Sequence, residues 1–153
     1  MRDSGGIGAG RSCAATNASS DVVLFQATQI AVVDDDESVR QAIDNLLRSL
    51  GFTVRSFASG EDFLESHRRR RAACLISDMQ MPRMSGADIQ ATLAAEGDPT
   101  PVIFITAFPS DAGKARALAA GAVGFLAKPF DGGALIACVE QALRRRSPTP
   151  ELA

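Results

Sequence analysis

Four short segments of the sequence place charged or polar side chains at or directly after the end of an apolar run. They are VVDDD at 32–36, CLISD at 74–78, FIT at 104–106 and FLAKP at 125–129. Apolar runs of this length are typical of buried strands, and the carboxyl ends of parallel strands meet at one edge of a sheet. We therefore expect five side chains to converge at that edge: Asp34, Asp35, Asp78, Thr106 and Lys128.

Three carboxylates brought to one place repel one another unless a cation holds them together. Mg²⁺ prefers such oxygen ligands, and a carboxylate beside Mg²⁺ can attack a phosphoryl group and become an acyl phosphate. The phosphoryl oxygens would be neutralised by Mg²⁺, by Lys128 and by either the Thr106 hydroxyl or a backbone N–H. Asp78 stands alone and is the expected nucleophile, whereas the adjacent Asp34 and Asp35 suit metal binding. The predicted chemistry is Mg²⁺-dependent phosphorylation of an aspartate.

Five apolar stretches must position these residues, and they alternate with five stretches of helical periodicity. The expected strands are residues 29–33, 52–57, 72–77, 102–105 and 122–127. The expected helices are residues 37–50, 59–71, 85–97, 112–120 and 131–146. Continuous apolar strands separated by amphipathic helices are typical of a parallel sheet that is covered on both faces. The predicted fold class is α/β, with a five-stranded parallel sheet and helices on both faces.

Length and composition indicate one domain with two tails. The chain has 153 residues, of which 46% are hydrophobic, and this is enough for one ordinary globular core. Residues 1–26 are rich in Gly, Ala and Ser without periodicity, so we expect a disordered tail there. The domain is expected at 27–146, and residues 147–153 are expected to be a C-terminal tail or the start of a linker.

Composition also restricts the surroundings in which the chain works. No apolar run approaches the roughly 20 residues of a membrane span, so no membrane contact is expected. Three scattered cysteines indicate neither a disulfide framework nor a metal cluster, which favours a cytoplasmic location. The net charge of −2 argues against direct nucleic-acid binding.

The polar segments and their neighbours resemble the receiver domain of two-component response regulators, in particular receivers of the FixJ type. The matching motifs are VDDDESVR at 33–40, DMQMPRMSG at 78–86, ITA at 105–107 and GAVGFLAKPF at 121–130. They occur in the family's order and at its spacing, over about residues 28–146. The resemblance implies a CheY-like, flavodoxin-like sheet with strand order 2-1-3-4-5.

The resemblance also implies a role for each matching residue of the acidic site. Asp78 corresponds to the phosphoacceptor, Asp35 to a direct metal ligand and Asp34 to an acid that holds the metal through water. The main-chain carbonyl of Gln80 would complete the protein's ligands to Mg²⁺, together with Asp78. Lys128 would pair with a phosphoryl oxygen.

The remaining matching residues concern switching and lifetime. Thr106 would move to the phosphoryl group on activation, and Phe125 would be the coupled aromatic switch, acting by packing because it lacks a tyrosine hydroxyl. Pro129 would follow a cis peptide bond that aims the preceding lysine inward. Gln80 and Phe108 flank the path of the attacking water in the family, and we expect them to tune the phosphoryl lifetime.

The functional hypothesis is a phosphorylation-controlled signalling module of a two-component system, not an enzyme beyond its own phosphorylation and dephosphorylation. A histidine kinase or histidine phosphotransfer protein would be the donor. The output face would comprise the fourth helix, fifth strand and fifth helix, about residues 112–146, and it would contact an unknown partner or a second copy of the chain. The chain is then either a single-domain regulator or a receiver fragment.

Two alternatives remain open at this point. The first is a receiver-like scaffold that is never phosphorylated, against which the intact Asp78 and Lys128 argue. The second is a phosphohydrolase of the haloacid dehalogenase type, in which Asp34 is the nucleophile and Asp36 the acid and base. That alternative leaves Asp78 without a role.

Overall fold

The computed structural model describes residues 28–66 and 72–146 of the chain. The predicted N-terminal tail at 1–26 and the predicted C-terminal tail at 147–153 lie outside the described residues. The basic run at 67–71 lies outside them as well.

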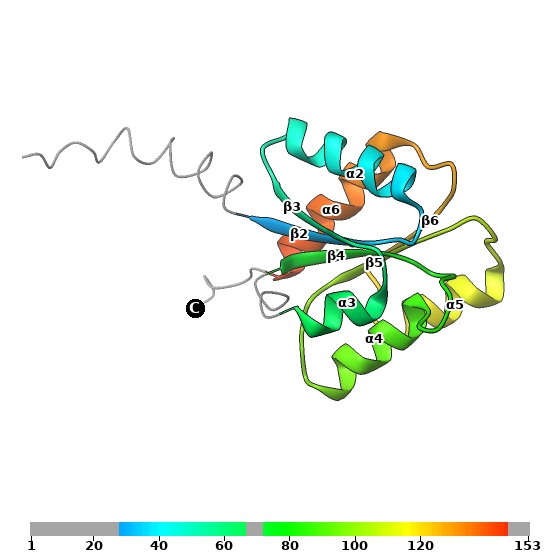
Figure 1. Cartoon of the computed structure of the whole chain (residues 1–153). Coiled ribbons are helices and arrows are strands. Elements are labelled where there is room, and N and C mark those ends of the chain that lie inside the picture. The colour runs from blue at the N-terminus through cyan, green and yellow to red at the C-terminus, as the bar shows by residue number, and fades with distance from the viewer. Residues whose placement is uncertain (1–27, 67–71, 147–153) are drawn as a thin grey trace, which may run out of the picture.

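The five strands that the structure describes form one parallel sheet at the centre of the domain (Figure 1). They are β2 (Gln29–Val33), β3 (Thr53–Phe57), β4 (Ala72–Asp78), β5 (Val102–Thr106) and β6 (Gly124–Ala127). Their order across the sheet is β3-β2-β4-β5-β6, and every neighbouring pair is parallel. Counted from β2 along the chain this is the order 2-1-3-4-5, so the predicted class and strand order are confirmed.

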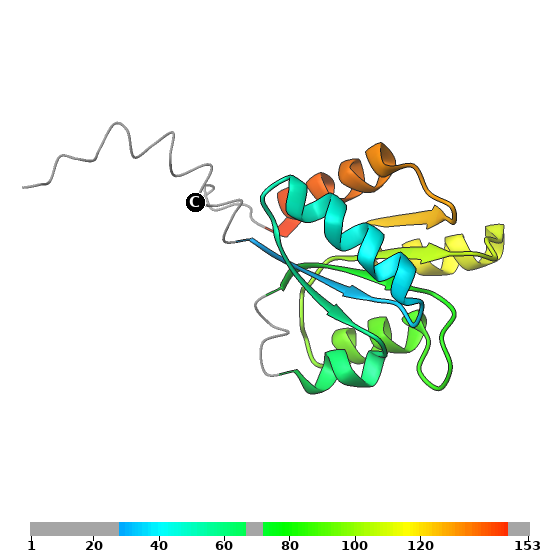
Figure 2. The same cartoon turned by 45° about the horizontal axis from the view of Figure 1, so that its top comes forward.

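Helices cover both faces of the sheet (Figures 1 and 2). On one face lie α2 (Glu37–Ser49) and α6 (Gly132–Arg146). On the other face lie α3 (Gly60–Glu65), α4 (Gly86–Ala95) and α5 (Asp111–Ala119). Each helix within residues 28–66 and 72–146 is too short or too polar to span a membrane.

A hydrophobic core lies on each face of the sheet, because successive strand side chains point to opposite faces. The core beneath α2 and α6 includes Ile30, Val32, Ile43, Leu47, Cys74, Ile103, Leu135 and Val139. The core beneath α3, α4 and α5 includes Val33, Phe63, Leu75, Ile89, Leu93 and Phe104. Strands β4 and β5 contribute to both cores, so the residues at their carboxyl ends are held by rigidly packed backbone.

The predicted start of the third helix is confirmed in atomic detail. The Asp88 N–H donates to the Ser85 hydroxyl (3.2 Å), and the Ser85 N–H donates to the Asp88 carboxylate (3.0 Å). This reciprocal capping box satisfies two backbone donors that a helix start otherwise leaves open. It fixes the N-terminus of α4, and with it one end of the loop that follows Asp78.

The predicted end of the second helix in the basic run is wrong. Helix α3 ends at Glu65, and Ser66 adopts an extended backbone (φ −70°, ψ 130°) while its N–H donates to the Phe63 carbonyl. The apolar residues of α3 are exhausted after Leu64, so a further turn would bury nothing against the sheet. Without burial a short helix gains too little to propagate.

The predicted start of the last strand at Ala122 is wrong as well, since β6 begins at Gly124. Gly121 has a positive φ of 106°, and the Ala122 N–H folds back to the Ala117 carbonyl (3.0 Å). A glycine in this conformation is a common helix C-terminal cap. Ala122 therefore belongs to the C-terminal cap of α5 and not to the strand. The same arrangement precedes β3, which begins one residue later than predicted.

Candidate functional site

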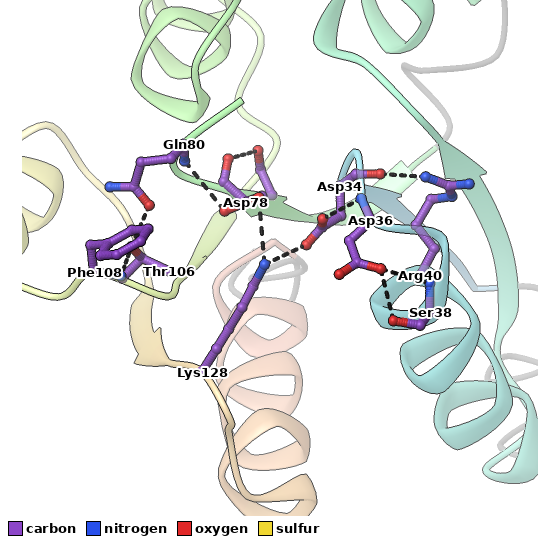
Figure 3. Close-up of polar contacts among 10 residues, drawn as sticks. Asp34, Asp36, Ser38, Arg40, Asp78, Gln80, Thr106, Phe108 and Lys128 are labelled. Carbon is purple, nitrogen blue, oxygen red and sulfur yellow. Dashed lines mark hydrogen bonds and ion pairs between the residues drawn. The ribbon is translucent and has the colours of Figure 1, made fainter. Parts of the chain in front are cut away.

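The carboxyl ends of four strands bring the predicted polar residues to one edge of the sheet (Figure 3). Asp34 directly follows β2 and Lys128 directly follows β6. Asp78 and Thr106 are the last residues of the central strands β4 and β5. The Lys128 N–H donates to the Thr106 carbonyl (2.7 Å), so backbone pairing continues to the site itself.

Asp34, Asp35 and Asp78 form a compact acidic cluster. One carboxylate oxygen of each lies within 4.8 Å of the others. Asp34 and Asp78 are buried, whereas Asp35 is exposed. A set of carboxylate oxygens with one member open to water suits Mg²⁺, which takes a few carboxylates and keeps several of its waters. The residues present therefore fit the predicted cation.

Lys128 lies against the two buried acids. Its Nζ is 3.0 Å from Oδ2 of Asp34 and 3.4 Å from Oδ2 of Asp78. Burial lowers the pKa of Lys128, but the ion pairs with Asp34 and Asp78 outweigh it, so the pKa is raised above its ordinary value. The lysine therefore stays protonated and offsets one of the negative charges of the cluster.

The surroundings of Asp78 change its proton affinity. Burial raises the pKa of Asp78, and the charge of Asp34 raises it further. Lys128 and the Gln80 N–H, which is 3.3 Å from Oδ1, act in the opposite direction without cancelling the increase. An acid with a raised pKa in the folded state destabilises the protein when it is ionised, and this penalty disappears as the pH falls through the raised pKa.

Asp78→Asn is therefore expected to stabilise the metal-free protein at neutral pH. The gain should lie in the range of about 0.5–2 kcal/mol that single stabilising substitutions commonly give, because the amide is neutral and is not repelled by Asp34. It should shrink as the pH is lowered through the raised pKa of Asp78, where the wild-type carboxyl becomes neutral as well. Urea unfolding without divalent cations, at neutral and at acidic pH, measures the difference.

The matched control is Asp62→Asn, which removes an exposed aspartate from the first turn of α3. Its effect on unfolding free energy should stay within about 0.5 kcal/mol. A loss of stability in Asp78→Asn at neutral pH would contradict the charge balance described above.

Thr106, the predicted switch residue, is fully buried and makes two hydrogen bonds through its hydroxyl. The hydroxyl donates to the side-chain oxygen Oε1 of Gln80 (2.5 Å) and accepts the N–H of Phe108 (3.0 Å). Figure 3 shows Gln80 and Phe108 grouped with Thr106 beside Asp78. Gln80 and Phe108, the two predicted tuning residues, therefore both contact Thr106, the predicted switch residue. The sequence did not predict these contacts.

Phe125 and Pro129 complete the predicted set. Phe125 lies on β6 opposite Phe104 and packs, partly buried, against the core beneath α3, α4 and α5. It lines an open cleft between α4 and α5 together with Phe108, a residue that is 75% exposed. The Lys128–Pro129 peptide bond is cis, the isomer that the resemblance implied.

Arg40 supports the site and was missed by the sequence analysis. Its guanidinium donates to the main-chain carbonyl of Asp34 (2.6 Å) from the first turns of α2. A cationic side chain near a helix N-terminus is unfavourable next to the helix dipole. That mismatch was the available signal that Arg40 has a specific partner.

Asp36 has a structural partner of its own. Its carboxylate accepts the N–H (2.9 Å) and hydroxyl (2.7 Å) of Ser38 and caps α2, and hydrogen bonding to Ser38 lowers its pKa. The Asp36 N–H in turn donates to Oδ1 of Asp34 (2.8 Å). A low-pKa capping carboxylate is poorly suited to the acid and base role that the dehalogenase-type alternative requires.

Comparison with known proteins identifies a family whose description fits this geometry. The family model for the response regulator receiver domain matches residues 30–140. Among curated proteins, the chain is 37% identical over 131 residues to the response regulator protein TodT of Pseudomonas putida. That match covers 83% of this chain and 58% of TodT, so the chain spans little more than half the length of this relative.

Solved structures agree with the sequence comparison. The response regulator StyR superposes with a TM-score of 0.73 at 46% identity, covering 78% of this chain and 61% of that one. The crystal structure of FixJ-N superposes with a TM-score of 0.68 at 32% identity, covering 76% of this chain and 93% of that one.

Proposed function

Because the chain belongs to the response regulator receiver domain family, we propose that it is switched by phosphorylation of Asp78. Phosphorylation-based signalling is the function of this family, whose members are not classical enzymes. The finer assignment to Asp78 is supported by one observation above all. Asp78 shares an acidic cluster with Asp34 and Asp35 and is also contacted by Lys128.

The donor in this proposal is a phosphohistidine on a histidine kinase or a phosphotransfer protein. An oxygen of the ionised Asp78 carboxylate attacks the phosphorus, the P–N bond breaks as the O–P bond forms, and the imidazole leaves with the electron pair. Mg²⁺ held by Asp34, Asp35, Asp78 and the main-chain carbonyl of Gln80 would neutralise charge on the phosphoryl oxygens. Lys128 supplies a second positive charge on the same edge of the sheet.

Burial of Asp78 has two consequences for this chemistry. It limits the access of water to the nucleophile, and it strengthens the attraction between the phosphoryl group and Lys128 because the local dielectric constant is low. The repulsion that raises the pKa of Asp78 is relieved when a cation binds. The proposal therefore requires Mg²⁺ for phosphorylation.

The consequence of phosphorylation is proposed to be a change at the face formed by α5, β6 and α6. Phe125 lies on β6 in this face and would be repacked when Thr106 moves. An output partner or a second copy of the chain would bind there, without direct contact to nucleic acid or membrane, in the cytoplasm. Receivers interact with histidine kinases and with output domains.

Incubation with acetyl phosphate and Mg²⁺, followed by intact mass measurement and peptide mapping, tests the proposal. Wild type should gain one phosphate, mapped to Asp78, and removal of Mg²⁺ by EDTA should abolish the gain. Asp78→Asn should gain none, because an amide oxygen is a poor nucleophile and forms no acyl phosphate.

The alternatives give different results in the same experiment. A phosphate that persists in Asp78→Asn but is lost in Asp34→Asn would favour the dehalogenase-type phosphohydrolase. A wild-type protein that gains no phosphate, and that also fails to bind beryllofluoride with Mg²⁺, would be a phosphorylation-independent scaffold.

A further inference from the structure

The hydroxyl of Thr106 has a resting partner that competes with the phosphoryl group. It donates its proton to Oε1 of Gln80 and accepts the N–H of Phe108. Gln80 belongs to the loop after β4 and Phe108 to the loop after β5, so this small network joins the two loops beside Asp78. Figure 3 shows the Gln80 side chain turned away from the carboxylates and toward Thr106.

The competition follows from the hydrogen-bonding capacity of the groups. A threonine hydroxyl has one proton to donate. Phosphoryl oxygens are acceptors, so Thr106 can approach a phosphoryl group on Asp78 only by donating that same proton. The bond to Gln80 must then break, since Oε1 of Gln80 and a phosphoryl oxygen cannot both receive the proton.

We propose that the side chain of Gln80 is a latch that holds Thr106 in the resting conformation and so sets how readily the domain adopts its phosphorylated conformation. This inference rests on the proposed function of Asp78 and extends it to a positioning residue. The latch is distinct from the expected metal contact of Gln80, because that contact uses the main-chain carbonyl and the latch uses the side chain.

The surroundings of Gln80 allow the latch to open. Its side chain lines the cleft between α4 and α5, which has a volume of about 370 Å³ and also contains the exposed Phe108. Gln80 can therefore withdraw from Thr106 into open space without displacing the core. When Thr106 moves, the Phe108 N–H also loses its acceptor, so the loop before α5 is released in the same step.

Loss of the latch should shift the domain toward its phosphorylated conformation. The hydrogen bond between Thr106 and Gln80 stabilises the resting conformation and is absent from the proposed phosphorylated conformation. Such a bond contributes modestly to stability, enough to change an equilibrium by about threefold to tenfold. Removing the acceptor should therefore favour the phosphorylated conformation by a factor in that range.

The test compares wild type with Gln80→Met, which keeps the side-chain length and the main-chain carbonyl but removes the acceptor. The first measurement is NMR of the metal-free protein, in which the buried Thr106 hydroxyl proton should exchange with water faster in Gln80→Met than in wild type, because it has lost its acceptor. The second is the affinity for beryllofluoride in the presence of Mg²⁺, which should rise about fivefold in Gln80→Met. Beryllofluoride binding is an equilibrium that involves no hydrolytic water, so it isolates the latch from effects on phosphoryl lifetime.

Two further variants make the interpretation specific. Gln90→Met removes a glutamine that lines the same cleft and whose amide reaches the Ala117 carbonyl (3.4 Å), so it should leave both measurements unchanged. In a Thr106→Val background, which lacks the hydroxyl, Gln80→Met should change the affinity by less than about twofold, since coupled residues are not additive.

The outcomes separate the latch from the proposed function. A Thr106 hydroxyl that is equally protected in Gln80→Met, or an affinity gain that persists in the Thr106→Val background, overturns the latch. Unchanged beryllofluoride affinity in Gln80→Met, with normal binding by wild type, also overturns it. A wild-type chain that binds no beryllofluoride overturns the proposed function, and the latch as a device for that function with it.

Discussion

Lys128→Met is expected to slow the phosphorylation of Asp78 by acetyl phosphate about 100-fold. Removing one positioned donor from a buried reaction site typically costs 100-fold or more in rate. The variant keeps the apolar stem of the side chain and removes the ammonium group, with its charge and its hydrogen-bond donors. Initial rates from intact mass measurement with saturating Mg²⁺ give the ratio directly.

The same substitution should destabilise the metal-free protein by about 3 kcal/mol, because it leaves the buried Asp34 and Asp78 carboxylates without their cation. The loss should shrink when Mg²⁺ is added, since the metal supplies the missing charge. It should also shrink as the pH falls, because protonation of Asp78, whose pKa burial and Asp34 already raise, removes one of the uncompensated charges.

The control for Lys128 is the only other lysine of the chain, Lys114, which is exposed on α5. Lys114→Met should change neither the phosphorylation rate by more than about twofold nor the unfolding free energy by more than about 0.5 kcal/mol. Equal stability of Lys128→Met and wild type in the absence of Mg²⁺ would refute the ion-pair account of the site.

Gly86→Ala is expected to distort the site from a position outside it. A Cβ at residue 86 would lie 2.6 Å from the main-chain oxygen of Asp78 and 2.8 Å from the ring of Phe104. The Asp78 backbone is fixed in the central strand, and the ring of Phe104 is fully buried, so neither can move without cost. Overpacking of this kind costs about 1–3 kcal/mol, and we expect the upper part of that range.

Function should suffer in the same variant because the contact is with Asp78 itself. The Gly86 N–H also donates to the Met79 carbonyl (3.0 Å), which closes the loop between β4 and α4. Displacing this loop moves the carboxylate relative to Lys128, and we expect phosphorylation to slow about tenfold or more. Urea unfolding and the acetyl phosphate assay measure the two effects.

Gly132→Ala is the matched control at a helix start. A Cβ there would lie 3.5 Å from the nearest atom, on Leu46, which is ordinary contact. Its unfolding free energy should stay within about 0.5 kcal/mol of wild type or increase slightly. If Gly86→Ala kept the stability and the phosphorylation rate of wild type, the loop after β4 would tolerate a side chain at this position, against this prediction.

Local patterns in the sequence determined the fold and the membership of the acidic cluster. Continuous apolar strands alternate with amphipathic helices, and this periodicity depends only on which face each residue must bury. The register of a parallel sheet then places Asp34, Asp78, Thr106 and Lys128 at one edge, as the structure shows. The convergence of these side chains, which depends on residue type and on where each strand ends, could therefore be predicted from the sequence.

The ends of helices and strands were harder to predict from the sequence, because burial and backbone capping override composition. Four arginines in a row resemble the end of a helix, yet α3 ends before them when its apolar residues run out. Ala122 resembles the start of a strand, yet its N–H completes the cap of α5. Each outcome depends on a neighbour that the local pattern does not contain.

The partners of individual polar groups were decided by the tertiary structure alone. The Thr106 hydroxyl donates to Gln80 rather than to a group on its own strand, and Arg40 reaches the main-chain carbonyl of Asp34. Hydrogen bonds require atoms within about 3 Å, and that accuracy is set by packing across strands that are distant in the chain. Residue type tells which bonds a side chain can make, and only the packed fold determines which of them it does make.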